Sequence, residues 1–257
     1  MNTQTIVLIH GMYMTPTCWT DWATRLRANR YRVFTPAWPG RDRSVADLRQ
    51  AASASALGQL TLSAVVNHLA QFIQTLEEKP VIIGHSMGGL VVQLLLQKGL
   101  AAAGIAIDSA PPMGVFTVAP SFLKANWGHI TPFANLNAAV VMTFERFQYA
   151  FVNGMPLEEQ RAAFEKYVVP ESRRVPRESL TAKIDFKHPH APLLIIAGGN
   201  DHIIPASLNK TNYEKYQASA SITDFKEFAG RNHFLLGQPG WEVIADYCVE
   251  WVAAKGV

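Results

Sequence analysis

Residues 81–92 read Val-Ile-Ile-Gly-His-Ser-Met-Gly-Gly-Leu-Val-Val, which is a G-x-S-x-G turn between two apolar runs. The first run has the branched side chains of a buried strand, and the second is expected to continue as a helix. A serine at the tip of so tight a turn takes a strained backbone conformation, and its neighbours two positions away need to lack side chains. Gly84 and Gly88 meet this need, so the spacing predicts that Ser86 presents a nucleophilic hydroxyl.

Apolar runs of the same kind recur along the chain. They predict strands at Thr5–His10, Arg32–Thr35, Pro80–His85, Gly104–Asp108, Pro192–Ala197 and Ile222–Phe228. Segments with a helical period lie between them and predict helices that include Ala56–Glu77, Met87–Lys98 and Trp241–Val252. Continuous apolar strands suit a sheet that is covered on both faces. The order predicts an α/β fold with a mostly parallel six-stranded sheet and helices on both faces.

One region, residues 111–190, breaks this alternation because it is rich in proline and aromatic residues. About eighty residues are too many for one loop in a compact domain. We interpret the region as a helical cap inserted into a core domain of residues 1–110 and 191–257. Phe116 and Trp127 are expected to face a substrate pocket under this cap.

The composition indicates a packed globular protein, with 49% hydrophobic and 17% charged residues in a chain of 257. The net charge of +3 is too small to favour a nucleic-acid partner. The nearest approach to a basic patch, Arg41-Asp42-Arg43, is expected to be a solvated loop. The two cysteines, Cys18 and Cys248, make no disulfide framework and are interpreted as partly buried thiols.

The first eleven residues, MNTQTIVLIHG, show no basic segment and no cleavage site of a secretory signal. No apolar run approaches the ~18 residues of a membrane span. We therefore expect a cytoplasmic protein without a membrane span. The sequence predicts no particular oligomeric state.

The segment Gly-His-Ser-Met-Gly-Gly at residues 84–89 resembles the nucleophile elbow of the α/β-hydrolase family. The similarity to this family's layout extends over nearly the whole chain. It implies the α/β-hydrolase fold, with Ser86 as the nucleophile. It also implies that the acid and the base follow Ser86 in that order along the chain.

The resemblance also implies which residues complete the triad. Residues 193–205 are similar to the family's strand followed by a G-x-x-D loop, which implies Asp201 as the acid that orients the base. Asp108, at the end of the preceding strand, is an alternative because some family members use that position. His233 lies between the last strand and the last helix, where the family places its base.

Residues 6–12 are similar to the family's first strand and its His-Gly motif. The similarity implies an oxyanion hole made by the backbone N–H groups of Met12 and Met87, with Gly11 allowing the chain to turn. His10 is expected to form structural hydrogen bonds. An apolar, adjustable pocket is predicted near Gly11 and Tyr13 by the methionines around them and in the cap, Met12, Met14, Met113, Met142 and Met155.

Together these residues predict a serine hydrolase that transfers an acyl group to water without a metal or organic cofactor. The expected substrates are small-molecule carboxylic esters with an apolar acyl or alcohol part. A C–C bond hydrolase or an amidase on the same triad is an alternative. A non-catalytic α/β-hydrolase-like protein that binds a small molecule is another. With an ordinary histidine pKa of ~6.5, activity is expected to rise between about pH 6 and 7 as the base loses its proton.

Overall fold

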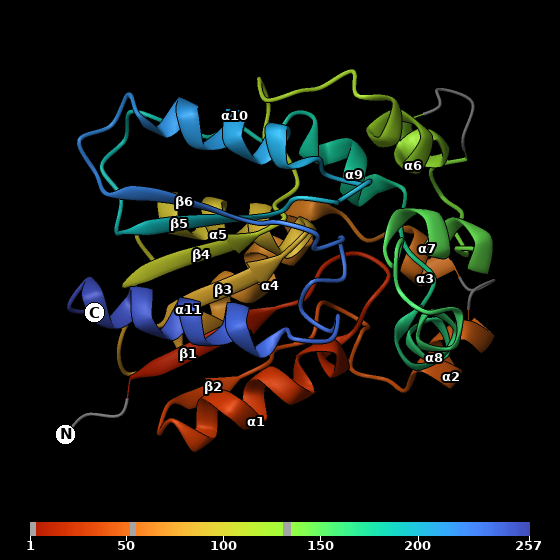
Figure 1. Ribbon diagram of the computed structural model, residues 1–257, viewed down its shortest axis with the longest axis horizontal. Helices are drawn as coiled ribbons and strands as arrows, with labels where there is room; N and C mark the ends of the chain where they lie inside the picture. The colour runs from red at the N-terminus through yellow and green to blue at the C-terminus, as the bar shows by residue number, and fades with distance from the viewer. Residues whose placement is uncertain (1–3, 52–54, 131–134) are drawn as a thin grey trace.

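The computed structural model describes residues 4–51, 55–130 and 135–257, and its arrangement is drawn in Figure 1. Its centre is a sheet in the order β2-β1-β3-β4-β5-β6, in which all neighbouring strands are parallel. The strands are β1 (Thr5–Ile9), β2 (Arg32–Phe34), β3 (Val81–His85), β4 (Ala103–Ile107), β5 (Leu193–Gly198) and β6 (Thr223–Phe228). The six predicted strands are confirmed, and each end lies within one residue of its prediction.

Burial explains why the strands read as continuous apolar runs. Every residue of β1, β3, β4 and β5 is buried, because helices cover both faces of the sheet there. Strand β6 lies at one edge, pairs only with β5 and is half-exposed. Its sequence, Thr-Asp-Phe-Lys-Glu-Phe, is correspondingly alternating and polar.

Two helical layers enclose the sheet. Helices α1 (Thr20–Ala28) and α11 (Glu242–Ala254) cover one face, and α4 (Leu62–Gln74), α5 (Met87–Gln97) and α10 (Ala206–Tyr216) cover the other (Figure 1). The first pair is tied by a bidentate contact in which Arg25 donates to both oxygens of Asp246 at 2.7 Å. On the opposite face, Tyr216 of α10 donates its hydroxyl to the side chain of Gln93 in α5 at 3.0 Å.

The single helix predicted over 56–77 is wrong, because the chain forms α3 (Ser55–Gly58) and α4 with a break between them. At the break, Thr61 accepts a hydrogen bond from the N–H of Ala64 at 3.1 Å and caps α4. Gly58 packs so closely on the carbonyl of Asn137 that a Cβ atom would overlap it. The break therefore follows from a cap and a close approach that helical periodicity does not report.

The first part of the chain also forms η1 (Pro16–Trp19), a single 3₁₀ turn, and α2 (Val45–Gln50). Both cysteines are free and buried, Cys18 in η1 and Cys248 in α11. Among the described residues, no helix has both the length and the apolar character that a membrane crossing requires.

Between β4 and β5 the chain forms α6 (Pro120–Ile130), α7 (Phe144–Ala150), α8 (Leu157–Tyr167) and α9 (Arg174–Ser179). In Figure 1 α6, α7 and α8 lie together at one end of the sheet, and α9 sits between them and the strands. Phe147 and Val175 from this segment are buried in the same hydrophobic cluster as the strands. The division of the chain into a core domain and a cap domain remains a prediction.

Candidate active site

Ser86 lies at the junction of β3 and α5 with a φ of 58°, a left-handed conformation that is strained for a residue with a side chain. Two backbone bonds hold it there. Its N–H donates to the carbonyl of Ile107 at 2.9 Å, and its carbonyl accepts from the N–H of Ala110 at 2.9 Å. The neighbouring strand β4 therefore fixes the turn that presents the hydroxyl.

The two glycines of the motif are required by space. A Cβ atom at Gly84 would overlap the carbonyl of Gly88, and a Cβ atom at Gly88 would overlap the carbonyl of Ile9. The turn therefore packs α5 directly against the end of β1. This close packing is the structural reason for the G-x-S-x-G spacing.

His233 lies in the loop between β6 and α11, and its Nε2 atom is 3.0 Å from Oγ of Ser86. Its carbonyl accepts a hydrogen bond from Nε2 of His85 at 2.7 Å. The next residue, Phe234, donates its N–H to the carbonyl of Phe151 at 3.0 Å. The Phe151 ring also stands edge-on to the imidazole, with the centroids 5.0 Å apart. These contacts fix the orientation of the ring.

Asp201 follows β5 and contacts the far side of the imidazole, with its Oδ2 atom 2.6 Å from Nδ1 of His233. Its other oxygen accepts two backbone hydrogen bonds, from Ile203 at 2.7 Å and from Ile204 at 2.9 Å. A carboxylate on Nδ1 places the proton of a neutral imidazole there. The lone pair of Nε2 then faces the hydroxyl of Ser86.

Asp108, the alternative acid, is also buried near this site but does not bond to His233. Its Oδ1 atom accepts the N–H of Gly198 at 2.6 Å, and its carboxyl group interacts with the carboxyl group of Asp201. Burial raises the pKa of both carboxyl groups well above the usual value, and the neighbouring charge of Asp201 raises that of Asp108 further, whereas hydrogen bonds to Asp201 act to lower its pKa. Two adjacent buried carboxyl groups cannot both ionise at low cost. Asp201 accepts more hydrogen bonds, so the charge is better placed on Asp201 and the proton on Asp108.

His10, by contrast, makes structural contacts, as expected. Its ring stacks on Trp38 at 4.7 Å, its Nδ1 atom donates to the carbonyl of Gly11 at 2.9 Å, and its Nε2 atom accepts the N–H of Trp38 at 3.3 Å. Burial lowers the pKa of His10 to about 3, so the ring is neutral.

Three side chains lie close enough together to be considered as metal ligands, His85, Asp108 and His233, which each offer one atom within 4.8 Å of the others. Both ring nitrogens of His233 already contact Asp201 and Ser86. A metal ion bound to this imidazole would break one of those contacts. The arrangement therefore suits proton transfer at Ser86 better than metal binding.

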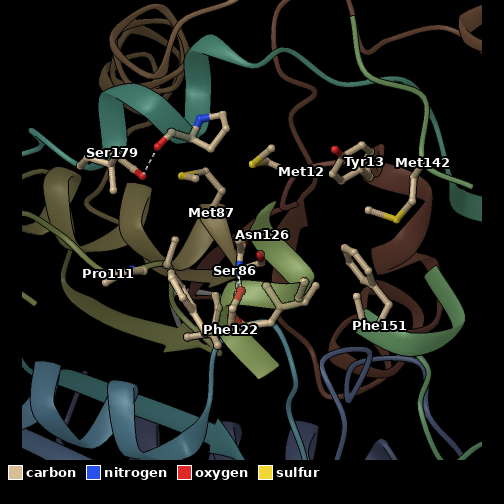
Figure 2. A pocket seen from close by; sticks show the side chains of 17 residues that line it. Met12, Tyr13, Ser86, Met87, Pro111, Phe122, Asn126, Met142, Phe151 and Ser179 are labelled. Atoms are coloured by element: carbon tan, nitrogen blue, oxygen red, sulfur yellow. Dashed lines mark hydrogen bonds between the residues drawn. The ribbon is translucent and has the colours of Figure 1, made fainter. Parts of the chain in front are cut away.

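The hydroxyl of Ser86 opens into a cavity of about 80 Å³, shown from close by in Figure 2. Met12 and Met87, whose backbone N–H groups were predicted to form the oxyanion hole, both line this cavity. Met87 is the first residue of α5, and N–H groups of a first helical turn have no partner within the helix. Met12 follows Gly11 in the loop after β1.

The walls of the cavity are mostly apolar, and none of the described residues that line it is charged. Two of its polar side chains are occupied by backbone partners. The Asn126 amide donates to the carbonyls of Phe122 and Ile203, and the Ser179 hydroxyl donates to the carbonyl of Pro176 at 2.7 Å. The larger apolar side chains come from α6, from the loops next to α7 and α9, and from the loop after β5, and include Phe122, Met142, Phe151, Leu180 and Ile203.

Of the four predicted pocket residues, the structure places only Tyr13 in the wall of the cavity. Gly11 is not among the residues that line the cavity, although it packs against Ser86, where a Cβ atom would be 2.8 Å from the Ser86 Cβ atom. Phe116 and Trp127 do not line the cavity, and they are 81% and 64% exposed. Both predictions are wrong because aromatic character does not specify which way a residue of this segment faces.

Helix α6 shows the physical reason. Phe122, Ala125 and Asn126 line the cavity, and their spacing of three and four residues places them on one helical face. Trp127 is one residue further, which turns it about 100° away from Asn126. The prediction missed Phe122 and Phe151 as lining residues. The spacing of residues 122, 125 and 126 places them on one face of a helix. The sequence does not indicate which face of that helix points toward Ser86.

The sequence matches the model of the family described as "Alpha/beta hydrolase family" over residues 6–245. The chain belongs to the α/β-hydrolase family. Among curated proteins, none matches the sequence significantly.

Solved structures of other α/β-hydrolases share the fold of this one. The Paleococcus ferrophilus monoacylglycerol lipase has a TM-score of 0.67 and 18% identity, with 98% of this chain and 96% of that chain covered. An Arabidopsis methylesterase has a TM-score of 0.70 and 16% identity, with 98% and 99% covered. An extracellular α/β-hydrolase from a Paenibacillus species has a TM-score of 0.67 and 22% identity, with 96% and 98% covered. At these identities the likeness shows the α/β-hydrolase fold alone, over at least 96% of the chain.

Proposed function

We propose that this α/β-hydrolase is a serine hydrolase that cleaves small, uncharged carboxylic esters with an apolar acyl or alcohol part. One observation supports the proposal above the others. An unbroken line of contacts runs from Ser86 through His233 to Asp201, and its hydroxyl end lies in an apolar cavity. This is the arrangement that nucleophilic acyl transfer requires.

In the first half of the reaction, Oγ of Ser86 attacks the carbonyl carbon of the ester. The hydroxyl proton passes to Nε2 of His233, and Asp201 stabilises the imidazolium through Nδ1. The carbonyl oxygen becomes an oxyanion, which the N–H groups of Met12 and Met87 bind. One such donor is worth about 3 kcal/mol of transition-state stabilisation.

In the second half, the imidazolium of His233 protonates the leaving alcohol oxygen as the ester C–O bond breaks. This leaves an acyl group on Ser86. A water molecule then loses a proton to the same imidazole as its oxygen attacks the acyl carbon. The bond between that carbon and Oγ of Ser86 breaks, the imidazolium returns the proton to Oγ, and the carboxylic acid leaves. The protein supplies all the groups that these proton transfers need.

The cavity supports the assignment of the substrate class. A charged substrate group would lose its hydration without meeting a counter-charge there, which is costly. The apolar wall instead stabilises a hydrocarbon part, and methionines such as Met142 adapt to its shape.

A panel of chromogenic substrates tests this proposal. We expect p-nitrophenyl esters of short and medium acyl chains to be hydrolysed faster than the matching anilides and faster than diketones. A fluorophosphonate probe should label the wild-type protein and leave Ser86→Ala unlabelled. Faster cleavage of diketones or anilides would instead identify a C–C bond hydrolase or an amidase. A folded wild-type protein that resists labelling would favour a binding protein.

A further inference from the structure

Tyr13, the residue after the proposed oxyanion donor Met12, has a left-handed backbone with a φ of 63°. Both of its backbone polar groups contact the segment between β4 and β5. Its N–H donates to Oε2 of Glu171 at 2.9 Å, and its carbonyl accepts the N–H of Val169 at 2.9 Å. A strained conformation of this kind persists only where surrounding contacts hold it.

The carboxylate that accepts the Tyr13 N–H belongs to a fully buried ion pair. Arg41 and Glu171 are both 0% exposed, and Nη2 of Arg41 lies 2.6 Å from Oε1 of Glu171. The same oxygen accepts the N–H of Ser172 at 2.7 Å, and Nη1 of Arg41 donates to the carbonyl of Pro170. The expectation that Arg41 lies in a solvated loop is therefore wrong. Its guanidinium is buried, and it pairs there with the carboxylate of Glu171, a residue distant in the sequence.

Stability alone does not explain such a pair. Well-packed apolar side chains in place of a buried ion pair are often as stable as the charges, because desolvation offsets the attraction between them. The pair does, however, fix the position of one particular acceptor atom. Oε2 of Glu171 is left to bond with the backbone of Tyr13 while Oε1 is held by Arg41 and Ser172.

The loop that carries Arg41 also reaches the other side of Met12. The N–H of Arg41 donates to the carbonyl of Trp38 at 2.8 Å, and Trp38 contacts His10 through its ring and its N–H. Met12 therefore lies between two anchored residues, His10 before it and Tyr13 after it. Trp38 of the 38–41 loop contacts His10 directly, and Arg41 of the same loop holds Tyr13 through Glu171.

We propose that Glu171, held by Arg41, is a positioning residue that fixes Tyr13 in its left-handed conformation and so directs the N–H of Met12 toward the oxyanion. The inference rests on the proposed function and adds a condition to it. The oxyanion hole is complete only while the segment that carries Glu171 is seated on the loop after β1.

Two double variants isolate the Tyr13 contact from the buried charges. Arg41→Met with Glu171→Gln removes both charges but keeps a side-chain oxygen that accepts the Tyr13 N–H. Arg41→Met with Glu171→Met removes the charges and the acceptor. We expect the first variant to keep kcat within about 3-fold of wild type and the second to lose about 10- to 100-fold, the usual effect of a small misplacement of catalytic groups. KM should change by less than about 3-fold in both, since uniform binding is retained.

A partly exposed ion pair elsewhere in the fold provides the control. Nε of Arg25 in α1 lies 2.7 Å from Oδ1 of Asp246 in α11. Arg25→Met with Asp246→Asn should leave kcat unchanged. Circular dichroism and thermal melting verify that each variant is folded.

The outcomes separate this inference from the proposed function. An active wild type with equal kcat in the two Arg41 double variants overturns the inference alone. A wild type without turnover overturns the proposed function and the inference together. If the Glu171→Met double variant does not fold, Glu171→Asp keeps the charge and withdraws the acceptor by one methylene. A lower kcat with unchanged KM in that variant supports the inference, and an unchanged kcat overturns it.

Discussion

Nε2 of His233 lies 3.0 Å from Oγ of Ser86, although 147 positions separate the two residues in the sequence. The parallel sheet brings them together because the carboxyl ends of all its strands open on one edge. Ser86 follows β3, and His233 comes from the loop after β6, which is the third strand from β3 in the sheet order. The loop that carries His233 is held in place by a hydrogen bond from the N–H of Asn200 to the carbonyl of Arg231 at 2.8 Å.

Removal of either reacting group should nearly abolish ester hydrolysis. We expect Ser86→Ala and His233→Ala each to lower kcat by about 10⁴- to 10⁶-fold, because the triad acts as a unit. His202→Ala is the matched control, since His202 lies beside Asp201 but bonds to the carbonyl of Tyr149. Steady-state kinetics on a p-nitrophenyl ester measure the effect. Substantial turnover by a folded Ser86→Ala variant would exclude Ser86 as the nucleophile.

Amide substitution should lower kcat strongly at Asp201 and only slightly at Asp108. Asp201→Asn is expected to lower kcat by about 10⁴-fold, because the amide favours the wrong tautomer of His233. Asp108→Asn should retain most activity, since asparagine can still accept the N–H of Gly198 and resembles a protonated carboxyl group. Comparison of kcat for the two variants decides the assignment. A larger loss in Asp108→Asn would make Asp108 the functional acid.

Burial should move the acid limb of the pH profile to lower pH. The base is active as the neutral imidazole, and burial lowers the pKa of His233 to about 3, which favours that form. Activity should therefore persist below the ordinary histidine pKa of ~6.5, and not fall between about pH 6 and 7 as an unperturbed histidine would predict. The measurement is kcat/KM from pH 4 to 8 at constant ionic strength. A limb at or above pH 6.5 would show that the charge of Asp201 outweighs burial at His233, or that Asp201 itself takes up a proton there, since burial raises the pKa of its carboxyl group well above the usual value.

Gly11→Ala should impair catalysis more than folding. The added Cβ atom would lie 2.8 Å from the Ser86 Cβ atom and 2.9 Å from the carbonyl of His85, so the nucleophile has to shift. A shift of this size is expected to lower kcat by about 10- to 100-fold. Gly99→Ala is the control, because its φ of 69° makes alanine strained while nothing lies within 4 Å. Gly99→Ala should lower the melting temperature and leave kcat unchanged. A lower kcat in Gly99→Ala together with an unchanged kcat in Gly11→Ala would contradict the prediction.

Substrate chain length should depend on Phe122 and not on Trp127. Phe122→Ala enlarges the cavity and should move the preferred p-nitrophenyl ester to a longer acyl chain. Trp127→Ala removes an aromatic ring from the same helix, but this ring is 64% exposed and lies outside the cavity. Its chain-length profile should match that of the wild type. A shift in the Trp127 variant would show that the substrate reaches Trp127.

Local patterns in the sequence predicted the sheet well and the irregular segments poorly. Strands that are buried on both faces must be apolar throughout. The apolar runs at 6–9, 81–83 and 193–196 could therefore be predicted as strands from the sequence. The single helix over 56–77 was wrong because Gly58 approaches Asn137, a contact between distant parts of the chain. The exposed Phe116 shows the same limit, since its environment is set by packing and not by its neighbours in sequence.

Local sequence patterns were enough to identify the chain as an α/β protein and to locate its strands. The sequence also pointed, through its resemblance to a family, to the three residues that the structure brings into contact. These features depend on residues that are close together along the chain, such as the two glycines on either side of Ser86. Their spacing can be seen directly in the sequence. Three features became known from the folded chain alone: the side chains that enclose the cavity, the acid that bonds to His233, and the contact of Arg41 with Glu171 in the interior. Each of these depends on how distant segments pack, and packing is a property of the whole chain.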